Sequence, residues 1–133
     1  MIKVNGNIIE QNHFSSGELK LHFPIILFNT TIKIEWYYEN DAELFTLICI
    51  KRYLDEHYLE YNCILYMPYI GHARMDRVKN KDDVFTLKYF CEVINSLGYD
   101  KVRVLDAHSN VSLALLNNIE PMDVSSHINQ AIY

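Results

Sequence analysis

Hydrophobic and polar residues alternate with a period of two in the first third of the chain. Apolar side chains occupy every second position from Leu19 to Phe23, and the same pattern returns from Ile32 to Trp36. Because successive side chains of a strand point to opposite faces, this alternation predicts two half-buried β-strands. A turn around Asn29-Thr30-Thr31 joins them in this prediction, which gives an N-terminal β-hairpin.

The period becomes helical after Asn40. One face of a helix of about five turns, at 3.6 residues per turn, is apolar. This face comprises Leu44, Leu47, Ile48 and Leu54. The helix begins with the capping pattern Asn40-x-x-Glu43, in which the Asn side chain accepts hydrogen bonds from free backbone N–H groups.

The second half of the chain alternates between strand and helix patterns. The short apolar run at 63–67 predicts a strand that is covered on both faces, and residues 101–106 form another predicted strand. A polar loop at 69–83 and helices at 84–97 and 111–116 complete a β-loop-α-β-α order. That order is typical of a parallel sheet with right-handed crossovers, so we predict an α/β fold. The weak pattern after Glu120 supports no prediction.

The helix at 84–97 has its own boundary signals. Asp82 or Asp83 is the predicted N-cap, and Gly98 is the predicted C-terminal stop. Its predicted buried face comprises Val84, Leu87, Cys91, Ile94 and Leu97.

Composition narrows the class of protein. The 133 residues are 50% apolar, which excludes a disordered chain and suits a single domain. No apolar run approaches the ~18 residues of a membrane span, and the N-terminus lacks a signal-sequence pattern. The net charge of −5 argues against a general nucleic-acid binder. Three cysteines without a CxxC pattern, Cys49, Cys63 and Cys91, indicate reduced core residues of a cytoplasmic protein.

Candidate chemistry follows both strands of the second half, where a parallel sheet binds ligands. Four of the twelve basic residues fall between Arg74 and Lys81, after the strand at 63–67. Arginine suits bidentate phosphate contacts, so this basic loop is a candidate anion site. The alternative is a solvated charged loop, since Asp76, Asp82 and Asp83 neutralise much of its charge.

The strand at 101–106 ends in a second polar motif, Asp106-Ala-His108. A carboxylate and an imidazole two residues apart can bind a divalent metal or exchange a proton. Ser109 and Asn110 then open a helix whose free N–H groups favour a phosphate. The alternative is that Asp106 only caps this helix and that His108 is a surface residue. No glycine-rich phosphate loop of either common kind is present.

Three segments together resemble one family. Phe14-Ser-Ser-Gly-Glu18, Pro68-Tyr-Ile-Gly-His-Ala-Arg-Met-Asp-Arg77 and Val104-Leu-Asp-Ala-His108 resemble, in order and spacing, the N-terminal half of ribose-phosphate pyrophosphokinase, also called phosphoribosyl pyrophosphate synthetase. The resemblance covers roughly Asn12 to Ile119 and includes the Asp41-x-Glu-Leu-Phe45 and Thr86-Leu-Lys-Tyr helices. It implies a phosphoribosyltransferase-like α/β fold.

The resemblance also implies an activity. The family transfers the β,γ-diphosphate of Mg²⁺-ATP to ribose 5-phosphate, and its ATP lies at a subunit boundary. By motif, Arg74, Arg77 and His108 would be catalytic, and Asp106 and His108 would meet the Mg²⁺. The ATP site would comprise Phe14, Ser16, Glu18, Arg74, Met75, Asp76 and Arg77, with Phe14 and Glu18 contacting the adenine of an ATP bound largely by a neighbouring subunit.

The chain departs from the family pattern in ways that leave alternatives open. Ser16 stands where the family usually has an acid, Met75 replaces a usual Gln, and His72 replaces a common Tyr. Asn117-Asn118 lies near a usual Asp, and the family's second-domain loop that binds ribose 5-phosphate is absent. We therefore expect residues 1–133 to be an N-terminal, ATP-contributing domain of a divergent branch, inactive alone. A non-catalytic regulatory homologue and a generic nucleotide-binding domain are the alternatives.

Partners follow from the same resemblance. ATP and ribose 5-phosphate are the expected small molecules, and a missing C-terminal domain is the expected covalent neighbour. A surface that docks this domain and other subunits should leave an exposed apolar patch, so we also expect a homo-oligomer. No nucleic acid or membrane partner is expected.

Overall fold

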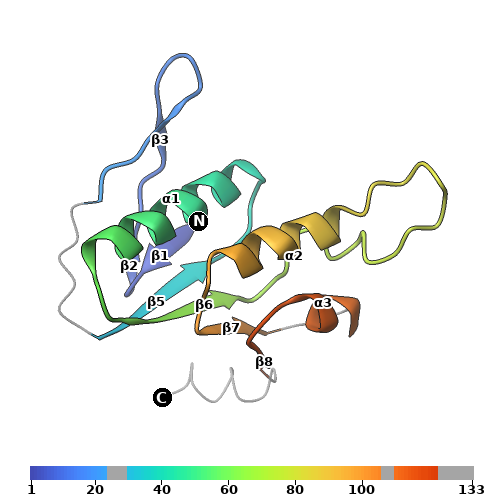
Figure 1. Cartoon of the computed structure of the whole chain (residues 1–133). Helices are drawn as coiled ribbons and strands as arrows, with labels where there is room; N and C mark the ends of the chain where they lie inside the picture. Colours follow the sequence, from blue (N-terminus) through green and yellow to red (C-terminus); the bar gives the residue numbers. More distant parts are fainter. Residues whose placement is uncertain (24–29, 106–109, 123–133) are drawn as a thin grey trace, which may run out of the picture.

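The computed structural model describes residues 1–23, 30–105 and 110–122 of the chain. Within these ranges lie a six-stranded sheet in the order β2-β1-β5-β6-β7-β8 and a separate two-stranded sheet, β3-β4 (Figure 1). The strands are β1 (Ile2–Val4), β2 (Asn7–Ile8), β3 (Asn12–His13), β4 (Leu19–Lys20), β5 (Thr31–Trp36), β6 (Asn62–Met67), β7 (Lys101–Val104) and β8 (Ile119–Pro121). The helices are α1 (Ala42–His57), α2 (Thr86–Ser96) and α3 (Asn110–Leu115).

The main sheet is mostly parallel. Strands β5 to β8 pair in parallel in chain order, and β1 joins β5 in the antiparallel sense. The predicted α/β class and the parallel β-α-β connection in the second half are therefore confirmed. Strands β1, β2 and β8 were not predicted, because each carries too few residues to show a clear hydrophobic period.

The N-terminal hairpins differ from the predicted pairing. Leu19 of β4 pairs with His13 of β3 and not with β5, so the predicted hairpin between 19–23 and 32–36 is wrong. Strand β5 lies inside the sheet, where it pairs with β1 on one side and with β6 on the other. The chain instead has local hairpins at β1-β2 and β3-β4, because short turns bring these neighbouring segments together.

The capping pattern at the start of α1 is confirmed. The Glu43 backbone N–H donates to Asn40 Oδ1 at 3.2 Å, and the Asn40 backbone N–H donates to Glu43 Oε1 at 3.1 Å. This reciprocal pair satisfies two N–H groups that the first helical turn leaves free. The buried face of α1 differs in part, because Leu47, Ile50 and Leu54 are fully buried whereas Leu44 and Ile48 are half-buried.

The predicted cap of α2 is wrong. The helix begins at Thr86 after Phe85, with no side-chain cap, and Val84 is 59% exposed. The Asp83 carboxylate instead accepts the backbone N–H groups of Lys79 at 3.3 Å and Asn80 at 3.0 Å. It therefore closes a turn of the preceding loop. The other residues of the predicted buried face are indeed buried, namely Leu87, Cys91, Ile94 and Leu97.

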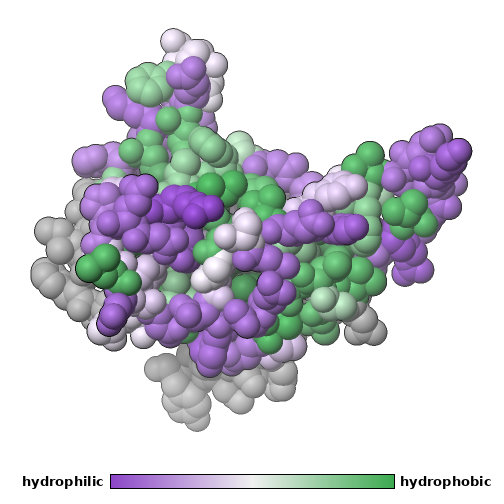
Figure 2. Space-filling view, in the orientation of Figure 1, coloured by the Kyte–Doolittle hydropathy of each residue, from purple (hydrophilic) through white to green (hydrophobic). Residues whose placement is uncertain are grey.

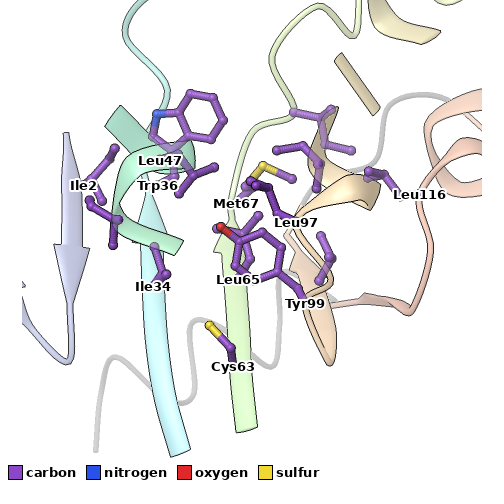
Figure 3. Packing of buried hydrophobic residues seen from close by; sticks show 14 of the residues in the cluster. Ile2, Ile34, Trp36, Leu47, Cys63, Leu65, Met67, Leu97, Tyr99 and Leu116 are labelled. Carbon is purple, nitrogen blue, oxygen red and sulfur yellow. The ribbon is translucent and has the colours of Figure 1, made fainter. Parts of the chain in front are cut away.

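The core lies between α1, α2 and the sheet (Figure 3). Ile34, Leu65 and Val104 of three adjacent strands are fully buried, and Leu47 of α1 and Ile94 of α2 are buried as well. Burial of each such side chain stabilises the fold by about 1.5–3 kcal/mol. Packing against helices α1 and α2 thus stabilises the paired parallel strands. The loops that follow therefore begin at well-defined strand ends. None of the helices in the described parts of the chain has the length and apolar character needed to cross a membrane.

The three cysteines are free, but they are not equally buried. Cys63 and Cys91 are buried in the core, as predicted, whereas Cys49 on α1 is only half-buried. Burial raises the pKa of Cys91 to about 11. Burial is also the main cause that raises the pKa of Cys63 to about 12. The nearby Lys51 ammonium acts to lower this pKa, whereas the Asp100 and Asp55 carboxylates raise it further.

We expect native-state alkylation to distinguish these thiols. Iodoacetamide should modify Cys49 at least about ten times faster than Cys63 or Cys91, because reaction requires an accessible thiolate. A time course followed by peptide mass spectrometry measures the three rates, and denatured protein provides the control. Equal native rates at the three positions would contradict the burial seen here.

Candidate functional site

The strands that precede the two candidate loops end at the same edge of the sheet. Strands β6 and β7 are parallel neighbours, and Met67 at the end of β6 lies opposite Val104 at the end of β7. Pro68 and Leu105 therefore start side by side at the carboxyl ends of the strands, where open parallel sheets bind ligands. The two strands that precede the candidate chemistry are therefore neighbours in the sheet.

The basic loop after β6 projects from the body of the molecule and is mostly hydrophilic (Figures 1 and 2). Arg74 is exposed, and the Arg77 side chain is 73% exposed while its Nε donates to Asp76 Oδ1 at 3.3 Å. Lys79 and Lys81 are exposed too. Of the nearby acids, Asp76 is bound to Arg77 and Asp83 is bound to loop backbone. The loop thus presents guanidinium and ammonium groups to any anion that reaches this edge.

The base of this loop is tightly packed. Ile70 is 2% exposed, and Gly71 lies under the Tyr38 ring. A Cβ atom at Gly71 would stand 2.8 Å from two ring carbons of Tyr38, so the close approach requires glycine here. His72 follows with a φ of 67°, a left-handed conformation that few non-glycine residues adopt. Its carbonyl accepts the Met75 N–H at 2.9 Å, which sets the direction of the chain at Arg74.

Three polar side chains, Tyr38, Asp41 and His72, meet at this base and form what we call the loop clamp. The Tyr38 hydroxyl and His72 Nε2 both donate to Asp41 Oδ1, the latter at 2.6 Å. The hydrogen bonds from Tyr38 and His72 lower the pKa of Asp41. Burial, together with the Asp41 hydrogen bond and charge, raises the pKa of Tyr38 to about 12. Asp41 therefore remains an acceptor and Tyr38 remains a donor at neutral pH.

A groove of about 280 Å³ lies beside the loop clamp, between the first turns of α1 and α2. It is lined by Asp41, Leu44, His72, Thr86, Tyr89, Phe90 and Val93. The His72 ring contacts Phe90, with their centroids 5.5 Å apart, so α2 supports the loop clamp on its apolar side. A more polar hollow of about 270 Å³ lies elsewhere, against β5, β6, β7 and β8.

The predicted adenine contacts lie on the β3-β4 hairpin, which projects from another part of the molecule (Figure 1). Phe14 is 51% exposed, and Ser16 and Glu18 are exposed in the turn. The turn is closed by the Phe14 N–H, which donates to the Glu18 carbonyl at 2.8 Å, and by Gly17 at a φ of 91°. Lys20 Nζ lies 5.5 Å from the centre of the Phe14 ring. One chain therefore does not bring these residues to its own basic loop.

The predicted metal residues, Asp106 and His108, lie outside the described residues. Within residues 1–23, 30–105 and 110–122, no group of three or more His, Cys, Asp or Glu side chains could hold a metal ion. Mg²⁺ is commonly held by one or two carboxylates together with substrate phosphates and waters, and not by an all-protein cage. The basic loop therefore offers cations for phosphates, and the carboxylates of the loop itself are those of Asp76, Asp82 and Asp83.

Sequence reasoning did not find the loop clamp. Asp41 is 31 positions from His72, and each looked ordinary, one in a helix start and the other in a polar loop. The signal that could have found them is the Gly71-His72 pair, which follows the buried strand β6, together with the start of α1, which follows the neighbouring strand β5. Only the pairing of β5 with β6 shows that these two segments lie close together.

The comparisons with known proteins give a fold. No family model and no curated protein sequence matches the chain. The structure is similar to the crystal structure of phosphoribosylpyrophosphate synthetase from Mycobacterium smegmatis, with a TM-score of 0.70 and 12% sequence identity, covering 94% of this chain and 43% of that one. The chain thus spans less than half of that protein's length. It has a phosphoribosylpyrophosphate synthetase-like α/β fold, with a mostly parallel sheet flanked by helices and an N-terminal β-hairpin.

Proposed function

We propose that residues 1–133 form the N-terminal, ATP-contributing domain of a ribose-phosphate pyrophosphokinase in the cytoplasm. This enzyme transfers the diphosphate of Mg²⁺-ATP to ribose 5-phosphate and makes phosphoribosyl pyrophosphate. The observation that carries the proposal is the exposed basic loop, which leaves the carboxyl edge of β6 beside the end of β7 in a synthetase-like fold. Phosphoryl-group transfer requires mainly positioning and charge neutralisation, which exposed arginines on a rigid edge supply.

Each candidate residue takes a role in this proposal. Arg74 and Arg77 neutralise the ATP phosphates, and Met75 and Asp76 line the nucleotide between them. His108 and Asp106 would hold the Mg²⁺, which, when bound, neutralises charge that develops on the transferred group.

The projecting hairpin supports a subunit boundary in the site. Phe14, Ser16 and Glu18 stand on an arm away from the basic loop, so they would serve the ATP of a neighbouring subunit. Large apolar side chains are also exposed on the helices, with Phe45 of α1 58% exposed and Tyr89 of α2 51% exposed. Such surfaces favour association, and we propose a homo-oligomer.

The acceptor site belongs to the proposed second domain. In the family, ribose 5-phosphate is held by a loop that has no counterpart among residues 1–133. We therefore propose that this chain alone binds nucleotide without completing the transfer. An assay for phosphoribosyl pyrophosphate formation from ATP and ribose 5-phosphate checks this, and robust turnover by the chain alone would overturn it.

Calorimetric titration with ATP and Mg²⁺ tests the nucleotide site. We expect saturable binding that Arg74→Gln weakens about ten-fold, since one charge-assisted phosphate contact is lost. Arg52→Gln is the matched control, because it removes the same charge from an exposed position on α1 and not from the basic loop, and it should change affinity less than about two-fold. His108→Ala should also weaken binding, and equal effects of the Arg74 and Arg52 variants would contradict the assignment.

The second candidate function is a non-catalytic regulatory homologue that assembles with active synthetases. Ser16 and Met75 favour it, because they remove an acid and an amide that the family uses at the nucleotide. The same titration separates the two functions. Undetectable ATP binding, together with co-purification with an active synthetase, would favour the regulatory homologue.

A further inference from the structure

We propose that residues 123–133 pack against the face of the main sheet that helices α1, α2 and α3 leave open. This inference goes beyond the proposed function and is independent of the nucleotide site. Residues 123–133 lie outside the described part of the chain, and the observations that point to them come from the face that they would cover.

One side of strands β5 to β8 carries the core, and the other side is here called the outer face. The core cluster includes Leu65 of β6, Leu47 of α1 and Ile94 of α2, and Leu113 of α3 packs against it. The three described helices therefore cover the same side of the sheet. Because side chains alternate along a strand, the outer face carries the intervening residues of these strands, namely Lys33, Glu35, Ile64, Tyr66, Lys101, Arg103 and Glu120.

Two apolar side chains of the outer face are buried although they do not belong to the core. Ile64 is 8% exposed and Tyr66 is 5% exposed, and neither is a member of the core cluster. Parallel strands occur almost only in sheets that are covered on both faces. The middle of the outer face, at β6, therefore has the character of a covered surface.

The polar hollow of about 270 Å³ lies against this face. It is lined by a row of residues in register across the strands, in which Tyr66 lies opposite Glu35 of β5 and Arg103 of β7. The last described residue, Met122, lines the hollow as well. Its backbone N–H donates to the Val104 carbonyl at 2.7 Å. The residues that follow Met122 therefore start from the rim of the hollow.

The side chains of the outer face do not complete their own contacts. Lys33 Nζ lies 5.2 Å from the centre of the Tyr66 ring and shields part of it. Arg103 Nε is buried without a hydrogen bond to any described residue, and its ion pair with Glu120 is long, at 3.6 Å. A buried donor without an acceptor costs about 1–3 kcal/mol, so Arg103 indicates that a further segment reaches this face.

The segment that follows Met122 has the length that this face requires. Three spacings of about 4.8 Å between neighbouring strands separate β8 from β5, a distance of about 14 Å. The residues from 123 to 133 would span about 16 Å as a helix, which rises about 1.5 Å per residue. A second copy of the chain is the less favoured occupant, because Met122 brings residues 123–133 to the hollow in every molecule.

The pattern of the segment suits the face too. Val124, Ile128 and Ile132 recur at every fourth position, which is the spacing of one helix face, and mostly polar residues separate them. This pattern is too weak to predict an element by itself. Its apolar positions nevertheless match the buried Ile64 and Tyr66, and its serine, asparagine and glutamine oxygens can accept the unpaired Arg103 donor.

Alkylation of Ile64→Cys in the full chain tests the contact. Iodoacetamide should modify this thiol slowly, and adding Ile128→Asp should raise the rate about ten-fold, because a charge at a packed position lifts the segment from the sheet. Gln130→Asp is the matched control, since it adds the same charge at a polar position, and it should change the rate less than about two-fold. An unchanged rate in the Ile128→Asp variant would overturn the proposal.

The neighbouring Cys63 provides an internal reference. It belongs to the core side, so tandem mass spectrometry should show a rise at residue 64 without a rise at Cys63. If the outer face instead binds a second copy, the residue-64 rate will fall as protein concentration rises and will not respond to Ile128→Asp. That result would overturn the assignment to residues 123–133.

A double-mutant cycle with milder substitutions keeps the test decisive if Ile128→Asp unfolds the chain. Ile64→Ala and Ile128→Ala should each raise the unfolding equilibrium constant in urea. Their combined effect should be about five-fold smaller than the product of the single effects, because both remove the same contact. Effects that simply multiply would overturn the proposal.

Discussion

Replacing Glu43 with Gln is expected to lower the free energy of unfolding by about 3 kcal/mol. The residue is 3% exposed and its carboxylate collects donors from four segments. These donors are the N-terminal ammonium of Met1, the backbone N–H groups of Glu39 and Asn40, the Trp36 indole N–H and the Gln11 amide. Removing the charge leaves the ammonium without its buried partner and turns an amide N–H₂ toward groups that are themselves donors. Chemical denaturation measures the loss.

Glu39→Gln is the matched control for this change. Glu39 also lies near the Met1 ammonium, at 3.6 Å, but its side chain is 67% exposed, so the pair contributes little. Its loss should cost less than about 0.5 kcal/mol. Similar costs for the two variants would contradict the role assigned to the buried carboxylate.

The same carboxylate makes the fold sensitive to acid. Burial by itself raises the pKa of Glu43, but the hydrogen bonds from the ammonium and from Glu39 and Asn40 bring the pKa below its ordinary value of 4.5. A carboxyl group with a lowered folded-state pKa stabilises the fold above its unfolded pKa, and this contribution disappears as the pH falls through the folded pKa. Wild-type stability should therefore decline below about pH 4.5, and Glu43→Gln should show a shallower decline.

Gly71→Ala is expected to destabilise the protein by about 2 kcal/mol. The new methyl group would stand 2.8 Å from two carbons of the Tyr38 ring and 3.3 Å from the Phe90 ring. The Tyr38 ring is hemmed in by Trp36, whose ring centre is 5.4 Å away, so it has little room to yield. Either the loop lifts or Tyr38 moves away from Asp41. Denaturation and exchange protection of residues 70–77 measure both consequences.

A double-mutant cycle isolates the cause of this effect. In a Tyr38→Ala background the ring is gone, and Gly71→Ala should cost less than about 0.5 kcal/mol. It can even stabilise the chain there, because alanine restricts the unfolded state more than glycine does. Additive costs in the cycle would show that the ring contact is not the source of the destabilisation.

The sequence predicted the parallel half of the fold because each element there carries its own signal. The segment that became β6 is a continuous apolar run of strand length, and the Asn40–Glu43 cap is local to four residues. The N-terminal pairing was wrong because alternation identifies a strand but not its partner. Strand β5 pairs with β1 and β6, and a partner such as β1, three residues long, gives almost no periodic signal.

The candidate site divides in the same way. Arg74 and Arg77 were identified because their motif is continuous in sequence, and the structure places them in an exposed loop. The loop clamp was missed because Tyr38, Asp41 and His72 become neighbours only through the β5-β6 register. The predicted α2 cap was wrong for a related reason, since the Asp83 carboxylate had two backbone N–H groups of its own loop within reach.

The β3-β4 hairpin carries candidate binding residues but contributes no side chain to the buried core. Its tip residues, Phe14 to Glu18, are all exposed, so substitutions there leave the packed core unaltered. Substitutions of the exposed side chains on this arm can therefore alter recognition with little effect on folding, Gly17 excepted because of its positive φ. The arm is a natural starting point for redesigning what the protein binds.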